Sequence, residues 1–226
     1  MQPVLILEND PGDGPGYLGD ALEHANVSTS LVRVHAGDPV PDLGSSAGVV
    51  ILGGSMGAYE SPTHAWLDDE ARLVREAVAR TVPVLGICLG AQLIAQALGG
   101  RAFPAERPEV AVLRSRLTPA GERHPLARFL TGPYLAFHQD TFDVPEDATL
   151  LASSESYPHV FRCGSALGIQ AHPEVSSDVA ARWGERSPLP ERAGVDYATV
   201  ISEMERLVPP SRPIALFSAW IDLVLR

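Results

Sequence analysis

One of the two cysteines of this chain stands between glycines, in the run Gly86-Ile87-Cys88-Leu89-Gly90. An apolar segment precedes the run and a helical pattern follows it, which predicts a tight strand-to-helix turn at Cys88. Small flanking residues permit such a turn and lift the side chain clear of the sheet. The following helix N-terminus favours a thiolate and offers N–H groups to a developing oxyanion. Cys88 is therefore a candidate nucleophile; the other interpretation is a small buried core residue.

A nucleophilic thiolate needs a group that carries protons, and His172 in the sequence AHPEV is the candidate among seven histidines. It ends an apolar segment, and residues two apart in an extended chain point to the same side, so Glu174 can lie beside it. A carboxylate there would orient the imidazole and stabilise its charged form. Pro173 suits the end of a strand. The other interpretation of His172 is an ordinary core or surface side chain.

A second glycine-rich turn contains Gly53 and Gly54, in the run ILGGSMGAY. It follows the preceding predicted strand and should emerge at the same edge of the sheet as Cys88. Without Cβ atoms, these residues can bring backbone N–H groups close to a reacting carbonyl. An ordinary turn between a strand and a helix would look the same.

The elements that must position these residues alternate along the first hundred residues. Strands are predicted at 4–9, 29–35, 48–54 and 83–87, and helices at 16–25, 61–80 and 89–98. The helix over 61–80 carries Asp68, Asp69 and Glu70 in its first turn, which matches the helix dipole. Alternation of this kind predicts an α/β fold, with an open, mostly parallel sheet and helices on both faces.

The second half changes character: residues 101–170 read as short strands and residues 176–226 as helices. No segment is rich enough in Pro, Gly or Ser to be a linker. We therefore expect a single domain over 1–226, with a core at 3–175 and a helical C-terminal extension at 176–226.

Composition excludes several functions. The chain has 226 residues, 45% of them hydrophobic, and a formal net charge of −11, which disfavours nucleic acid and anionic membranes as partners. No apolar run approaches the roughly 20 residues of a membrane span, and the N-terminus has no leader pattern. Two distant cysteines make no disulfide framework, so a cytoplasmic protein is expected. Neither zinc-ligand spacing nor a phosphate-binding glycine loop is present, so no metal or organic cofactor is expected.

Taken together, GICLGAQ, the downstream HPE and the upstream GGSMGAY resemble a class I glutamine amidotransferase domain of the Cys-His-Glu type. The nearest match is the free-standing branch related to GMP synthase. The likeness includes FHQDTFDVP and LLASS and covers about residues 3–175. It implies a flavodoxin-like fold of the class I glutamine amidotransferase kind.

The resemblance also implies roles for particular residues. Cys88 would be the nucleophile, His172 the acid and base, and Glu174 its orienting partner. The N–H of Leu89 and one from Gly53-Gly54 would form the oxyanion hole, and substrate would contact Gln92, His138 and Asp140. Ser55, Gln139 and Ala171 depart from the family pattern, which affects the shape of the pocket and removes no catalytic group.

The expected reaction is hydrolysis of the γ-amide of glutamine, or of a γ-glutamyl compound, through a γ-glutamyl thioester that releases ammonia or an amine. Only about 50 residues follow Val175, too few for a domain that activates an acceptor. A synthetase would then be a separate chain, or the enzyme would be a plain hydrolase. Residues around Trp183 and Tyr197 would either dock such a partner or pack the last helices.

Two other classes of function stay open. One is a non-catalytic or partner-activated regulatory subunit that donates ammonia to a synthetase. The other is a ThiJ-type redox or stress protein; that branch needs an acidic residue shortly before its cysteine, and residues 83–87 contain none.

Overall fold

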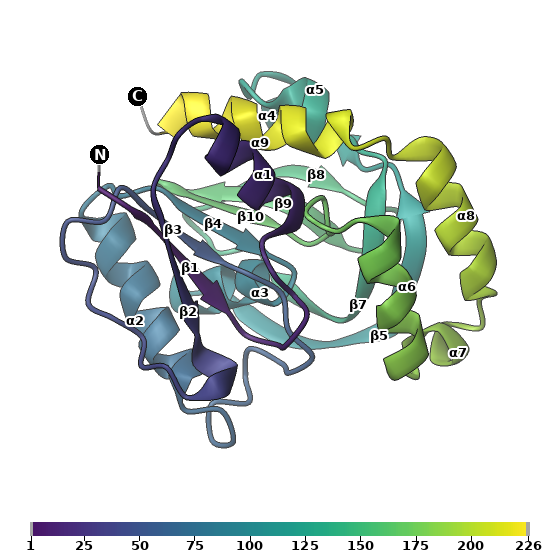
Figure 1. Ribbon diagram of the computed structural model, residues 1–226, viewed down its shortest axis with the longest axis horizontal. Coiled ribbons are helices and arrows are strands. Elements are labelled where there is room, and N and C mark those ends of the chain that lie inside the picture. The colour runs from purple at the N-terminus through teal and green to yellow at the C-terminus, as the bar shows by residue number, and fades with distance from the viewer. Residues whose placement is uncertain (1, 225–226) are drawn as a thin grey trace.

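The computed structural model describes residues 2–224 and places a central eight-stranded sheet between layers of helices (Figure 1). The strand order is β2-β1-β3-β4-β10-β9-β8-β6. The first five of these strands are parallel and the last three pair antiparallel. Their bounds are β2 (Thr29–Arg33), β1 (Val4–Glu8), β3 (Gly48–Ile51), β4 (Val84–Ile87), β10 (Ala166–Ile169), β9 (Pro158–Cys163), β8 (Thr149–Ser153) and β6 (Arg116–Leu117). The predicted α/β fold with a mostly parallel sheet is confirmed.

The parallel strands are buried on both faces, as their continuous apolar runs require. On β3 and just after it, Val50 and Leu52 belong to one hydrophobic core, while Val49 and Ile51 belong to the other. Successive side chains of a strand point to opposite faces, so one short segment contributes to both cores.

Helices cover both faces of the sheet. One core contains residues of α2 (Trp66–Ala79) and α3 (Leu89–Ala97), and the other contains residues of α1 (Gly16–His24) and α9 (Ser211–Val224). The remaining helices are α4 (Pro119–Glu122), α5 (Ala127–Leu130), α6 (Ser177–Arg186), α7 (Leu189–Ala193), α8 (Tyr197–Leu207) and the 3₁₀ turn η1 (Val34–Ala36). Among residues 2–224, none of the helices has the length and apolar character that a bilayer crossing requires.

The second helix differs from its sequence-based prediction. It begins at Trp66 rather than near residue 61, because residues 61–65 form turns. Asp68 and Asp69 lie in its first turn as expected, but the side chain of Glu70 is fully buried. Burial raises the pKa of Glu70 to about 8, which outweighs the opposing effect of Asn9.

A separate two-stranded sheet was not foreseen. It consists of β5 (Arg101–Leu113) and β7 (Tyr134–Asp143), which pair antiparallel (Figure 1). The register shifts between Pro104 and Glu109, an irregularity that lets one long strand bend where shorter strands were predicted. Helices α7 and α8 contact β5, so this sheet carries the C-terminal helices beside the main sheet.

Candidate active site

Cys88 occupies the junction between β4 and α3 in a conformation that L-residues rarely adopt. Its φ is 51° and its ψ is −107°, and its N–H donates to the carbonyl of Ile169 at 2.8 Å. The flanking glycines are required by contact: a Cβ on Gly90 would lie 2.1 Å from the carbonyl oxygen of Ile51, and one on Gly86 would lie 2.4 Å from that of Gly90. A strained residue held by its surroundings is typical of a functional site.

His172 and Glu174 form a buried pair. Nδ1 of His172 lies 2.7 Å from Oε1 of Glu174, and their side chains are 3% and 4% exposed. The backbone holds both residues: the N–H of His172 donates to Leu135, and the carbonyl of Glu174 accepts from Tyr17. Although β10 ends at Ile169, His172 forms an isolated antiparallel bridge to Leu135, which keeps the backbone extended there. The side chains of His172 and Glu174 therefore point to the same side, as their two-residue spacing predicts.

The electrostatics of this pair favour a charged imidazole. Burial by itself lowers the pKa of His172, but the Glu174 carboxylate and the Cys88 side chain outweigh burial and hold that pKa well above its usual value. Trp183 packs against the ring in an edge-on arrangement, with centroids 4.8 Å apart. The imidazole is therefore placed between an acid, a sulfur and an aromatic wall.

The Gly53-Gly54 turn lies directly against these side chains. A Cβ on Gly53 would lie 3.2 Å from Cε1 of His172 and 3.8 Å from Cβ of Cys88. A Cβ on Gly54 would lie 2.8 Å from Cδ2 of Leu89, the first residue of α3. The first N–H groups of a helix have no partner within the helix, so Leu89 supplies a donor next to this turn.

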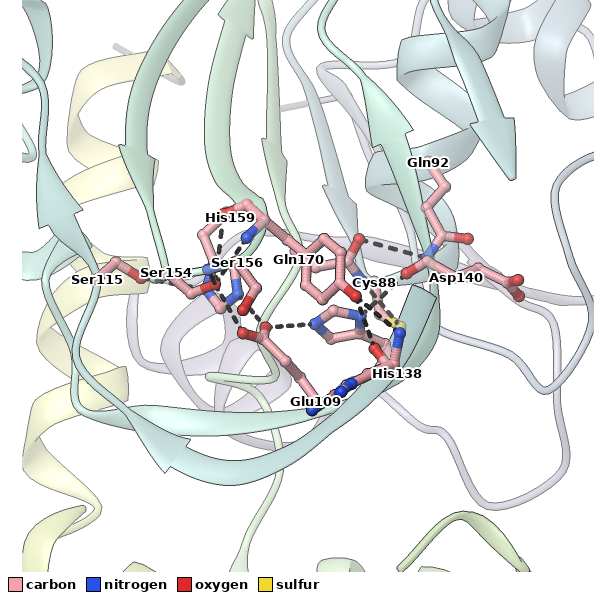
Figure 2. A network of polar contacts seen from close by, with 12 residues as sticks. Cys88, Gln92, Glu109, Ser115, His138, Asp140, Ser154, Ser156, His159 and Gln170 are labelled. Atoms are coloured by element: carbon pink, nitrogen blue, oxygen red, sulfur yellow. Dashed lines mark hydrogen bonds and ion pairs between the residues drawn. The ribbon is translucent and has the colours of Figure 1, made fainter. Parts of the chain in front are cut away.

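The three residues predicted to contact substrate lie in or beside the same cavity, and their polar atoms bind the protein. Nε2 of Gln92 donates to the Asp140 carbonyl at 3.2 Å and to Oε1 of Gln170 at 3.3 Å. Both ring nitrogens of His138 are engaged, Nδ1 with the Asp140 carbonyl and Nε2 with Glu109 (Figure 2). The Asp140 carboxylate accepts a hydrogen bond from Tyr59. The protein thus holds each of these side chains in place along one wall of the cavity, and their contact with substrate stays a prediction.

A cavity of about 480 Å³ opens over Cys88. His172, Gly54, Gln92, His138 and Asp140 line it together with Cys88. Helices α6 and α7 contribute Trp183, Arg186 and Arg192, so the C-terminal extension helps to form the site. A volume of this size is typical of small-molecule sites.

Two residues near the Cys88–His172 pair were not identified from the sequence, Asp13 in the cavity lining and the buried Gln170. Asp13 lies in the loop after β1, and burial raises its pKa to about 7 although the nearby His172 opposes the shift. Nε2 of Gln170 donates to Sγ of Cys88 at 3.5 Å. The sequence could have indicated both residues by their position, because each follows a strand that ends at the sheet edge where Cys88 lies.

Of the three departures from the family pattern, Ser55 and Gln139 line the cavity, and Ala171 is buried outside its lining. Ser55 donates to Asp10 from its hydroxyl at 2.5 Å, and Gln139 accepts from Arg192. Trp183 lines the cavity and packs against Phe137, and Tyr197 packs against the same ring. Both side chains therefore have packing partners within the protein, and their docking of another chain stays a prediction.

Comparison with known proteins agrees with this geometry. Residues 17–182 match the family profile of class-I glutamine amidotransferases. The glutamine amidotransferase-like protein YfeJ of Salmonella typhimurium is 29% identical over 195 residues, 80% of each chain. A solved glutamine amidotransferase from Thermotoga maritima has a TM-score of 0.86 at 27% identity and covers 100% of this chain and 98% of its own.

Two further relatives have more specific names. A glutamine-hydrolysing GMP synthase of Thermomicrobium roseum is 32% identical over 136 residues, which cover 58% of this chain and 24% of the synthase. Gamma-glutamyl peptidase 4 of Arabidopsis thaliana is 31% identical over 150 residues, 61% of this chain and 57% of the peptidase. The chain thus spans about a quarter of that synthase. Because the family profile matches far more than half of its residues, the chain belongs to the class I glutamine amidotransferases.

Proposed function

We propose that this protein hydrolyses the γ-amide of glutamine, or of a small γ-glutamyl compound, through a γ-glutamyl thioester on Cys88. The observation that carries the proposal is the buried 2.7 Å pair of His172 and Glu174 beside a strained cysteine at the start of a helix. Family membership and relatives with glutamine-hydrolysing and γ-glutamyl names support the same chemistry.

The residues divide the reaction between them. The Cys88 thiolate attacks the γ-carbonyl carbon, and the N–H groups of Leu89 and the Gly53-Gly54 turn bind the resulting oxyanion. The imidazolium of His172 gives its proton to the departing amine, which breaks the C–N bond and leaves the thioester. A water molecule then attacks the thioester carbonyl while neutral His172 takes its proton, and glutamate departs as the sulfur regains its electron pair.

The charged groups of the cavity suit a zwitterionic amino acid. Asp10 and Asp13 can face an α-ammonium group, and Arg186 and Arg192 can bind an α-carboxylate through charge-assisted hydrogen bonds. The cavity volume leaves room for a second group on the amide nitrogen, which favours γ-glutamyl amines and dipeptides as well as glutamine.

The test is glutamate release from a panel of glutamine, γ-glutamyl amines and γ-glutamyl dipeptides. Wild-type protein is expected to release glutamate from at least one member, and Cys88→Ser to release none. Equal rates for both proteins would overturn the proposal.

A second function is favoured by the relatives that belong to synthetases: donation of ammonia to a separate synthetase chain. If the chain donates ammonia to a synthetase, its glutaminase activity should be low when it is assayed alone and should rise when a co-purifying synthetase is added. Full activity without any partner would exclude partner activation.

A further inference from the structure

A second cluster of chemically active side chains lies behind the wall of the cavity. Glu109, His138 and His159 come from β5, β7 and β9, and one oxygen of the glutamate faces both rings (Figure 2). Nε2 of His138 lies 3.0 Å from Oε2 of Glu109, and Nε2 of His159 lies 2.8 Å from the same oxygen. Both imidazoles are 1% exposed, and the carboxylate is 14% exposed.

The opposite ring nitrogens fix how these imidazoles point. Nδ1 of His138 lies 2.9 Å from the Asp140 carbonyl, and Nδ1 of His159 lies 3.1 Å from the hydroxyl of Ser115. The second carboxylate oxygen of Glu109 accepts a hydrogen bond from Ser154 at 2.7 Å. Outer hydrogen bonds of this kind are what orient histidine and carboxylate ligands of metals.

Counting protons shows that the cluster is suited to a cation. A carbonyl only accepts hydrogen bonds, so Nδ1 of His138 must carry a proton. In the neutral ring, Nε2 then presents a lone pair to the carboxylate oxygen of Glu109, and the two repel each other. A cation bound by both atoms replaces this repulsion with attraction.

We propose that Glu109, His138 and His159 bind one divalent ion of the zinc type, separate from the Cys88 site. Two imidazoles and a carboxylate are a donor set that zinc uses, with a fourth position left for water. The three ligand atoms already lie within 4.8 Å of one another. Bonds of about 2.1 Å in tetrahedral geometry need ligand atoms about 3.4 Å apart, so the carboxylate oxygen must move about half an ångström away from each ring nitrogen and the two nitrogens, within 4.8 Å of each other, must adjust to the same spacing.

The ion would connect the two sheets and the wall of the cavity. It links three strands from two sheets, and the Asp140 carbonyl that orients His138 also accepts from Gln92 in the wall of the cavity. The Glu109 carboxylate, 14% exposed, is the part of the cluster that solvent reaches. The sequence contains no compact zinc-ligand spacing because the three donors lie on three separate strands.

The test uses Cys88→Ser as the parent protein, because a thiolate beside an imidazole also binds soft metals. Co²⁺ serves as the probe: the parent is expected to bind one equivalent with visible absorption of a tetrahedral site, and Zn²⁺ to displace it. Adding His159→Gln, whose amide can still donate to Glu109, should weaken binding at least about 100-fold, and Ser115→Ala about tenfold. The matched control is His24→Gln, on an exposed residue of α1, which should bind like the parent.

Thermal melting with and without Zn²⁺ gives a second measurement. Zinc should raise the melting temperature of the parent and leave that of the His159→Gln variant unchanged. Absence of saturable Co²⁺ and Zn²⁺ binding by the parent, or equal binding by the His159→Gln variant, would overturn the proposal and leave the three residues as a hydrogen-bonded ion pair network.

Discussion

Replacing Glu174 by glutamine tests the charge arrangement at the centre of the candidate site. The substitution keeps the shape of the side chain and an oxygen that can accept from Nδ1 of His172, but it removes the negative charge 2.7 Å away. Because the Glu174 carboxylate is one of the groups that raise the pKa of His172 against the effect of burial, that pKa should fall in the variant.

The expected loss follows from burial. Removing one partner of a buried ion pair costs about 3–5 kcal/mol, and each 1.36 kcal/mol corresponds to a factor of ten in rate. If the full cost falls on the transition state, kcat/KM drops by about 150- to 5,000-fold. The retained hydrogen bond places the expected value toward the lower end of that range.

Two assays read the result. The first is kcat/KM for the best substrate of the γ-glutamyl panel. The second is alkylation of Cys88 by iodoacetamide as a function of pH, followed on the Cys88 peptide so that Cys163 does not contribute. Because a charged His172 stabilises an anionic sulfur beside it, the variant should be alkylated more slowly than the wild type.

A matched control comes from Glu70→Gln, a carboxyl that is also fully buried but lies outside the residues of the cavity. Its activity should stay within about twofold of the wild type. If Glu174→Gln folds and retains wild-type kcat/KM and an unchanged alkylation profile, the carboxylate has no part in the chemistry and the reasoning fails.

The remaining predictions concern packing, pH and stability. Gly53→Ala should lower kcat about 100-fold, because its methyl group would lie 3.2 Å from Cε1 of His172. The control is Gly14→Ala, where a Cβ meets nothing within 4 Å. Equal kinetics for both variants would contradict the proposed close approach of Gly53 to His172. In the wild type, KM should fall as pH rises through about 7, because Asp13 ionises there and can bind an ammonium group. Asp13→Asn should raise KM about tenfold and abolish this pH dependence. A KM profile of the variant across pH 6–8 that matches the wild type would exclude that role. For Glu70, the folded protein keeps a proton up to pH about 8 that the unfolded chain has already lost, so wild-type stability falls as pH rises from about 4.5 to about 8. Glu70→Gln removes this cost, so urea unfolding should show a gain of roughly a few kcal/mol at pH about 8.5 and a much smaller one at pH about 4.5; equal gains at both would refute the linkage.

Local patterns predicted the backbone geometry around Cys88 and the proximity of His172 to Glu174. The glycines around Cys88 leave few alternatives to a tight turn, and the two-residue spacing of His172 and Glu174 needs only an extended backbone to bring them together. The edge of the sheet where Gly53 meets them follows from parallel topology.

Features that depend on tertiary contacts were not predictable. The pairing of β5 with β7 depends on a register shift near Glu109, which no periodicity in the sequence reveals. Trp183 was considered only as a docking or packing residue, because its contact with His172 arises from how α6 folds back. His138 shares the cavity wall as expected, but its bonds to Asp140 and Glu109 appear only when three strands meet.

The central claim is that a γ-glutamyl thioester forms on Cys88, and rapid acid quenching of wild-type protein during turnover, followed by peptide mass spectrometry, tests it most directly. A γ-glutamyl adduct is expected on the Cys88 peptide; it should disappear when substrate is exhausted and be absent from Cys88→Ser. Sustained glutamate release without any adduct at Cys88, or an adduct on another residue, would contradict it.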